Sequence, residues 1–206
     1  MTINALNHKS GFTLVEIIFV VSIFLLSVVV LTNLQKDIFV NNLFVQNSLM
    51  AESEARGALK RAIAEIRSAA PANNGFYPIE TAGTSTLTFY SDTNRDGLRE
   101  RVRYFIATTT LKRGLIKPTG EPTVYLAGNE IISTVVNDIV VSTSTPLFSY
   151  YDSTYNGTTS AMTYPLNLSK IRLIKMTILI EADPNRSPLP LFFSSQVMIR
   201  SLKDNL

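Results

Sequence analysis

Cysteine and tryptophan are absent from this 206-residue chain, and its only histidine is His8. Without cysteine there is neither a disulfide nor a thiolate metal site. If the first eleven residues are removed, the remaining chain has no histidine either. Serine–histidine–aspartate catalysis, cysteine–histidine catalysis and histidine-ligated zinc are then excluded. The composition therefore argues against an enzyme and predicts no catalytic residues.

Residues that break helices are scarce in the first third of the chain. No proline occurs before Pro71, and Gly11 and Gly57 are the only glycines in this stretch. One helix can therefore run from Phe12 to about Ala70, a length of roughly 87 Å at 1.5 Å per residue. The sequence PANNG, which follows directly, is expected to end it.

Charge is almost absent from residues 12–32, where Glu16 is the only ionisable side chain. About 20 apolar helical residues cross a hydrocarbon core, so this run predicts a transmembrane helix. A cleaved secretory signal has a shorter apolar region followed by small residues at the cut, and no such site follows here. A plain signal anchor remains an alternative. A carboxylate in hydrocarbon is costly, so Glu16 needs a partner or a function.

The sequence SGFTLVEIIF (residues 10–19) resembles the N-terminus of type IV pilins and of the pseudopilins of type II secretion. The resemblance implies that residues 1–11, with Lys9, are a prepilin leader peptide. It also implies that a prepilin peptidase cuts between Gly11 and Phe12, and that the new Phe12 amine is N-methylated. Glu16 then stands four residues beyond the new terminus, as in that family.

Cleavage gives Glu16 a candidate partner. In a helical filament the Glu16 carboxylate of one subunit can face the Phe12 amine of its neighbour, and this charge pair would set the axial register between subunits. The alternative is that Glu16, near the helix end, extends to the lipid headgroups. Phe12 and Glu16 are therefore the candidate residues for subunit assembly.

Residues 33–70 continue the helix with an amphipathic pattern, and one apolar stripe is expected to pack on a sheet. Its members recur at multiples of three or four residues: Ile38, Val45, Leu49, Leu59, Ile63 and Ile66.

Residues 71–206 form a head domain in which alternating polarity predicts antiparallel strands. Strands are expected within 85–92, 99–107 and 109–118, and two short ones within 137–152. The segment 126–138 is ambiguous between a strand and a helical turn. Residues 169–183 and 191–203 are expected to pair through the proline-rich linker 184–190. The prediction is an α+β fold: a long N-terminal helix packed on an antiparallel sheet domain, with the layout of pilins.

An acidic loop at residues 91–101 lies between two of these strands. Its spacing matches the first half of a Ca²⁺ loop, with Gly97 allowing the sharp turn. Arg103 takes the place of the last glutamate of an EF-hand, so an EF-hand is excluded. A hairpin turn explains the same residues, and both interpretations stay open. The candidate Ca²⁺ ligands are Asp92, Asn94, Asp96, Leu98 and Glu100.

The stretch from LTFYSDTNRDGLRERVRYF (residues 87–105) to the closing VMIRSLKDNL (residues 197–206) also resembles minor pilins and the J-type minor pseudopilin. The resemblance implies a structural subunit that meets other pilin or pseudopilin subunits, the prepilin peptidase, an assembly platform and its ATPase. The implied location is a single pass through the cytoplasmic membrane with the N-terminus inside, followed by the filament. The size of the head favours a minor subunit.

A membrane-anchored binding module is the alternative function, either a Ca²⁺-dependent adhesin or a DNA-uptake pilin. Tyr150, Tyr151 and Tyr155 lie in or beside a candidate exposed loop at residues 151–165, but they fit a core equally well. The net charge of +3 and the absence of a basic run of five argue against nucleic-acid binding.

Overall fold

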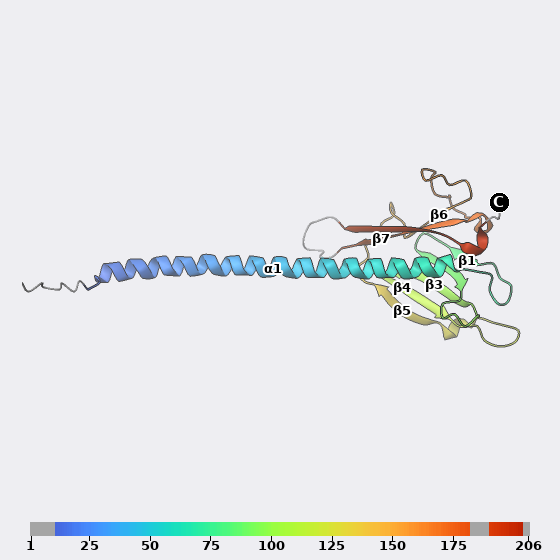
Figure 1. The fold of residues 1–206 in the computed structure, drawn as a ribbon, viewed down its shortest axis with the longest axis horizontal. Helices are drawn as coiled ribbons and strands as arrows, with labels where there is room; N and C mark the ends of the chain where they lie inside the picture. Colours follow the sequence, from blue (N-terminus) through green and yellow to red (C-terminus); the bar gives the residue numbers. More distant parts are fainter. Residues whose placement is uncertain (1–10, 182–189, 204–206) are drawn as a thin grey trace, which may run out of the picture. The chain divides into compact units, whose positions relative to one another are not determined.

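The computed structural model describes residues 11–181 and 190–203. It confirms the α+β prediction: a long apolar N-terminal helix is followed by antiparallel sheets that pack on its C-terminal part (Figure 1). The chain divides into two compact units, residues 1–46 and residues 47–206. We call the second the globular unit; it contains both sheets and the last turns of the helix.

Helix α1 spans Leu14–Arg67, close to the predicted bounds. Its first turn is capped by Thr13, whose hydroxyl oxygen accepts a hydrogen bond from the Glu16 backbone N–H at 3.3 Å. Its last turn ends where Ser68 bonds back to the Ala64 carbonyl and across to the Ser91 hydroxyl at 2.8 Å. The helix therefore stops against the sheet, just before the PANNG sequence.

The predicted apolar stripe of α1 is confirmed only in its second half. Leu59, Ile63 and Ile66 are buried, whereas Ile38, Val45 and Leu49 are at least half exposed. Alanines that the stripe did not include, such as Ala55 and Ala62, are fully buried instead. Periodicity identifies which face is apolar, but not how far along the helix the sheets cover it; small residues allow the closest approach.

The larger sheet has five antiparallel strands in the order β1-β2-β3-β4-β5. The strands at 85–92, 99–107 and 109–118 are confirmed, and β1 was missed because its four residues carry no clear alternation. The ambiguous segment resolves into both alternatives: a 3₁₀ turn at Ala127–Asn129 and then a strand. The bounds are β1 Ile79–Ala82, β2 Thr86–Ser91, β3 Glu100–Ala107, β4 Thr110–Ile116 and β5 Ile131–Val136.

The smaller sheet has the order β6-β7-β8, with β6 at Phe148–Tyr151, β7 at Leu173–Ile180 and β8 at Leu191–Met198. The expected final pair is confirmed, since β7 and β8 pair over eight residues without a register shift. The expectation of two strands in 137–152 was wrong: only β6 forms, and Ile139 makes a single bridge to Ile180. Most of the linker 184–190 lies outside the described residues.

The core of the globular unit lies where α1 meets both sheets. Buried residues of the helix contact a continuous apolar cluster drawn from β2, β3, β4, β6 and β7. Tyr150 belongs to this core and not to an exposed loop, because it is 1% exposed and its hydroxyl donates to the Gly83 carbonyl at 2.8 Å. Tyr151 is also buried, and the Tyr155 ring packs against it in a tilted arrangement, with 4.2 Å between ring centroids.

Candidate functional site

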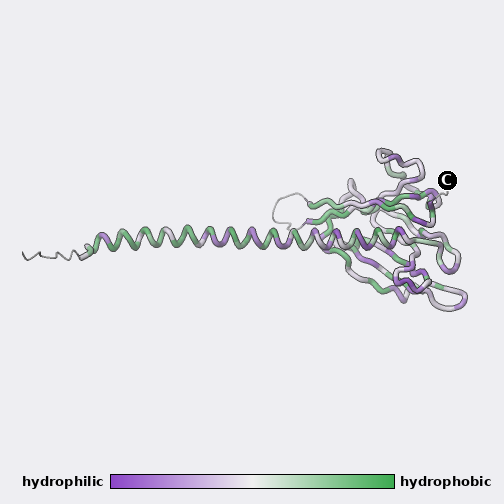
Figure 2. Tube along the Cα trace, viewed as in Figure 1, coloured by the Kyte–Doolittle hydropathy of each residue, from purple (hydrophilic) through white to green (hydrophobic). Residues whose placement is uncertain are grey.

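The N-terminal unit has the hydropathy of a membrane anchor. Helix α1 is long and apolar enough to cross a membrane, by length and composition, and the apolar colour predominates along its first half (Figure 2). Phe12 is 79% exposed, and the large apolar side chains from Leu14 to Leu31 are all exposed. Nothing in the described part of the chain buries these side chains, so lipid or a partner molecule can do so.

Polar side chains within the apolar run bond to the helix itself. The hydroxyls of Ser22, Ser27 and Thr32 each donate to the carbonyl four residues earlier, at 2.8 Å. Such bonds satisfy the hydroxyl without water, so these residues do not oppose a membrane location. Among the described residues, no ion pair is formed by Glu16, which is exposed. The carboxylate is therefore open to a partner outside this chain.

Sequence reasoning missed a local role for Glu16. Thr13 and Glu16 have the spacing of a capping box, and the bond from the Glu16 N–H to the Thr13 hydroxyl is one half of that motif. An acid in the first turn is also favoured by the helix dipole. The signal was present in the letters TLVE, and it means that Glu16 stabilises the helix start as well as being available to a neighbour.

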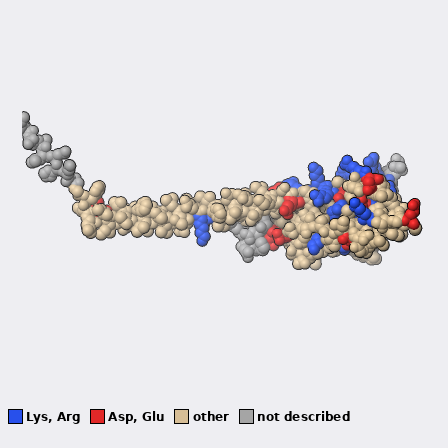
Figure 3. Space-filling model, turned by 90° about the horizontal axis from the view of Figure 1, so that it is seen from below, with Lys and Arg blue, Asp and Glu red and all other residues tan. Residues whose placement is uncertain are grey.

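Charged side chains gather over the globular unit, and few lie along the preceding helix (Figure 3). Three arginines of this unit bind glutamates through two hydrogen bonds each. The pairs are Arg113–Glu65, Arg101–Glu80 and Arg103–Glu130. None was identified from the sequence, because each pair joins residues that are 21 or more positions apart.

The Glu65–Arg113 pair connects α1 to β4 at the edge of the core. Its two nitrogen–oxygen distances are 2.9 and 3.0 Å, and both side chains are less than 15% exposed. The Tyr104 hydroxyl donates to the same carboxylate at 2.8 Å. Burial, and then the adjacent Glu65 carboxylate, raises the pKa of Tyr104, which keeps the hydroxyl protonated as a donor. The cluster fixes the rotation of the helix on the sheet.

The Arg103–Glu130 pair explains the glycine in β4. Gly114 lies opposite Arg103 in the register of β3 and β4. A Cβ atom at Gly114 would stand only 2.1 Å from a carboxylate oxygen of Glu130. The Glu130 side chain therefore crosses β4 over the bare backbone of Gly114 to reach Arg103, whose guanidinium also stacks 4.0 Å from the Phe105 ring.

The acidic loop lies between β2 and β3 and is closed by its own backbone. Asp92 accepts hydrogen bonds from the N–H groups of Arg95, Asp96 and Gly97, at 2.6, 3.2 and 3.0 Å. Asp96 accepts from the Leu98 N–H at 2.8 Å. Arg95 and Gly97 have positive φ angles of 64° and 88°. This is the hydrogen-bonded turn that the sequence analysis gave as the alternative to a Ca²⁺ site.

The other candidate ligands are placed differently. Asn94 donates to the Asp96 carboxylate at 2.7 Å, and its carbonyl oxygen accepts the Asp96 N–H. Glu100 is 1% exposed, and one carboxylate oxygen accepts both the N–H and the hydroxyl of Thr93 at 2.9 Å. Leu98 is half exposed. In the part of the chain that the structure describes, no three His, Cys, Asp or Glu side chains are placed to hold a metal ion. The Ca²⁺ site remains a prediction.

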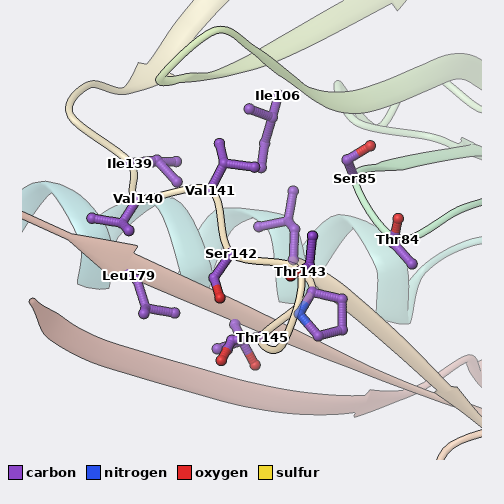
Figure 4. A pocket seen from close by; sticks show the side chains of 13 residues that line it. Thr84, Ser85, Ile106, Ile139, Val140, Val141, Ser142, Thr143, Thr145 and Leu179 are labelled. Carbon is purple, nitrogen blue, oxygen red and sulfur yellow. The ribbon is translucent and has the colours of Figure 1, made fainter.

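A hollow of about 380 Å³ opens between the two sheets. Ile106, Ile139 and Leu179 supply apolar surface, and Ser85 and Thr145 supply hydroxyls (Figure 4). All thirteen side chains that line it are uncharged, so it offers van der Waals contacts and hydroxyls but no acid or base.

No protein-family model matches the chain, and no curated protein matches it.

Proposed function

We propose that this chain is a structural subunit of an extracytoplasmic filament, a minor pilin or pseudopilin, and that its function is assembly and not catalysis. One observation carries the proposal. A run of exposed apolar helix with Glu16 as its only charge follows directly on a Gly11–Phe12 pair, and it leads into a globular unit that pairs its own buried charges.

The proposed sequence of events begins in the membrane. The chain inserts with its N-terminus in the cytoplasm and residues 12–32 in the bilayer. A prepilin peptidase cuts after Gly11, and the Phe12 amine is methylated. An assembly ATPase and its platform protein then move the subunit from lipid into a fibre, whose core is formed by the apolar helices and whose outside is formed by the globular units.

Because its surface is apolar, the helix must pass from lipid to neighbouring helices without being exposed to water. A large side chain of this kind gains roughly 1.5–3 kcal/mol on burial, so exposing the 16 large apolar side chains of residues 12–32 to water together is prohibitive. Lipid and neighbouring helices offer similar surroundings. Transfer between them is therefore governed by packing and by the Glu16 carboxylate, which favours a site beside a positive amine.

The test is a paired substitution in cells that contain the assembly machinery. Glu16→Ala should leave processing at Phe12 intact and reduce recovery of the subunit in sheared filaments at least tenfold. Glu54→Ala is the control, because Glu54 is an exposed acid of the same helix outside the apolar run. Normal incorporation of the Glu16→Ala chain would remove the charge pair from the mechanism. An uncut chain that still begins at Met1 would favour a membrane-anchored binding module.

A further inference from the structure

Strand β8 is an edge strand without the usual protection against pairing. Natural edges are shortened, bulged or charged so that they do not recruit another strand. Of the four edge strands in the described part of the chain, β1 and β6 have four residues each, and β1 and β5 have register shifts. β8 has eight residues, LFFSSQVM, with no charge, no proline and no register shift.

The outer backbone groups of β8 can be identified from its neighbour. The Thr177 N–H donates to the Leu147 carbonyl at 2.8 Å, so Thr177 directs its backbone groups toward β6. Pairs alternate in an antiparallel ladder, so the even-numbered residues of β7 bond to β8. The register then leaves four residues of β8 with N–H and C=O groups directed away from β7: Phe192, Ser194, Gln196 and Met198.

A groove of about 540 Å³ lies between this strand and helix α1, within the globular unit. Leu59, Ile63 and Phe193 give it an apolar surface, and Ser194 and Ser195 line its strand side. The cations Arg56, Lys60 and Arg67 line its helix side, and none of the described residues that line it is acidic. Arg56 is held in place by Glu52 on one side and by the Phe193 ring, 5.5 Å away, on the other.

We infer that this groove, the β8 groove, binds an extended, carboxylate-bearing segment of another protein, which adds to β8 as a fourth strand. The backbone groups of β8 supply the hydrogen bonds of strand addition, Phe193 and Ile63 supply apolar contact, and the three cations select acidic side chains. On the proposed function, which this inference extends, the other protein is a neighbouring filament subunit.

Charge complementarity decides between possible occupants. A second copy of this chain would have to bring an acidic extended segment, and among its described strands the one long unprotected edge is the uncharged β8 itself. A nucleic acid would satisfy the cations but would leave the backbone groups of β8 and its apolar side chains without partners. An acidic strand satisfies all three features.

The experiment uses the full chain in phospholipid nanodiscs and a fluorescent ten-residue peptide of alternating valine and glutamate. Fluorescence anisotropy should show saturable binding, and hydrogen exchange should slow in the 191–199 segment. A peptide with lysine in place of glutamate, and one with a central proline, should bind at least tenfold more weakly. Equal binding of either peptide would overturn the inference.

Two matched pairs of variants locate the site. Ser194→Pro removes an outward N–H, whereas Ser194→Ala keeps it; only the proline variant should weaken binding at least tenfold. Lys60→Glu reverses a charge of the groove, whereas Arg61→Glu reverses the next charge on the helix outside it; only the first should weaken binding. Wild-type affinity in both Ser194→Pro and Lys60→Glu would overturn the inference.

Two further outcomes would each overturn the inference as stated. Competition by single-stranded DNA with no effect of Ser194→Pro would mean that the groove responds to charge alone, and would contradict strand addition. Self-association of the full chain that Ser194→Pro abolishes would make a second copy the occupant instead. Processing at Phe12 is measured on the same variants and should be normal, so failure of the β8 groove is distinguishable from failure of the proposed function.

Discussion

At the scale of single residues, Glu65 is a buried acid that the apolar pattern of the helix did not identify. It lies on α1 next to buried Ile66 and is itself mostly buried, yet it is an acid among apolar neighbours. Its carboxylate is satisfied by Arg113 from β4 and by Tyr104 from β3. A buried charge is tolerable only with such partners, and removing one partner leaves the other unpaired.

Glu65→Gln should therefore reduce the free energy of unfolding of the globular unit by about 2–3 kcal/mol, because Arg113 loses its counter-charge. Urea unfolding followed by tyrosine near-ultraviolet circular dichroism measures this directly, since all eight tyrosines lie beyond residue 76. Glu54→Gln, an exposed acid of the same helix, is the control and should change stability by less than about 0.5 kcal/mol. Equal stability of the two variants would contradict the structural role of the pair.

The Glu80 carboxyl is expected to make the stability of the globular unit depend on pH. Burial alone would raise the pKa of its carboxyl, but hydrogen bonds from Arg101 and Tyr90 bring the pKa below its ordinary value of 4.5. A carboxyl with a lowered pKa stabilises the folded state above the pKa of the unfolded chain, and this contribution is lost as the pH falls through the folded pKa.

At about pH 6, Glu80→Gln should be less stable than wild type by about 1 kcal/mol, allowing for a side chain one-third exposed. The difference should close as the pH falls below about 4.5. Urea midpoints for both chains from about pH 6 to pH 3 test this. A difference that stays constant over that range would show that the carboxylate charge has no part in it.

At the scale of elements, periodicity predicted the long helix and most strands, because those features depend on local sequence. The helix lacks proline, and β3 alternates between buried and half-buried residues over its first six positions. β1 was not predicted, because a four-residue strand has too few positions to show an alternating pattern. The second strand expected before β6 did not form, since residues between Ile139 and Pro146 have no ladder partner among the described residues.

The acidic loop is an element whose sequence allowed two interpretations. The Asp92 carboxylate accepts three backbone N–H groups, so the turn is stable without a cation. The spacing of aspartate and asparagine is shared by turns and by Ca²⁺ loops because both need short oxygen-bearing side chains. Sequence alone could therefore identify the loop but not its ligand.

The turn account predicts that Asp92→Ala lowers the melting temperature by about 6–12 °C, equally in EDTA and in Ca²⁺, since three backbone bonds worth roughly 1 kcal/mol each are lost. Wild type should melt at the same temperature in both. Asp152→Ala, a matched acid in another loop that bonds Thr154, is the control for general loop effects. A higher melting temperature of wild type in Ca²⁺, absent in Asp92→Ala, would instead establish the metal site.

At the scale of the whole molecule, the chain divides into a segment with an exposed apolar surface and a globular unit with paired charges. Most of the exposed large apolar side chains precede residue 51, while the three arginine–glutamate pairs that involve strand residues all lie in the globular unit. The first pattern could be predicted from composition. The charge pairs and the β8 groove could not, because each depends on which strands become neighbours and which edge stays open.

The central claim is that this chain is trimmed to a new Phe12 terminus and then polymerises through its apolar helix. Intact mass and N-terminal fragment spectra of the chain, purified from cells with an active prepilin peptidase, test it most directly. The account predicts a chain that begins with N-methylated Phe12. A chain that retains residues 1–11 in those cells would contradict it.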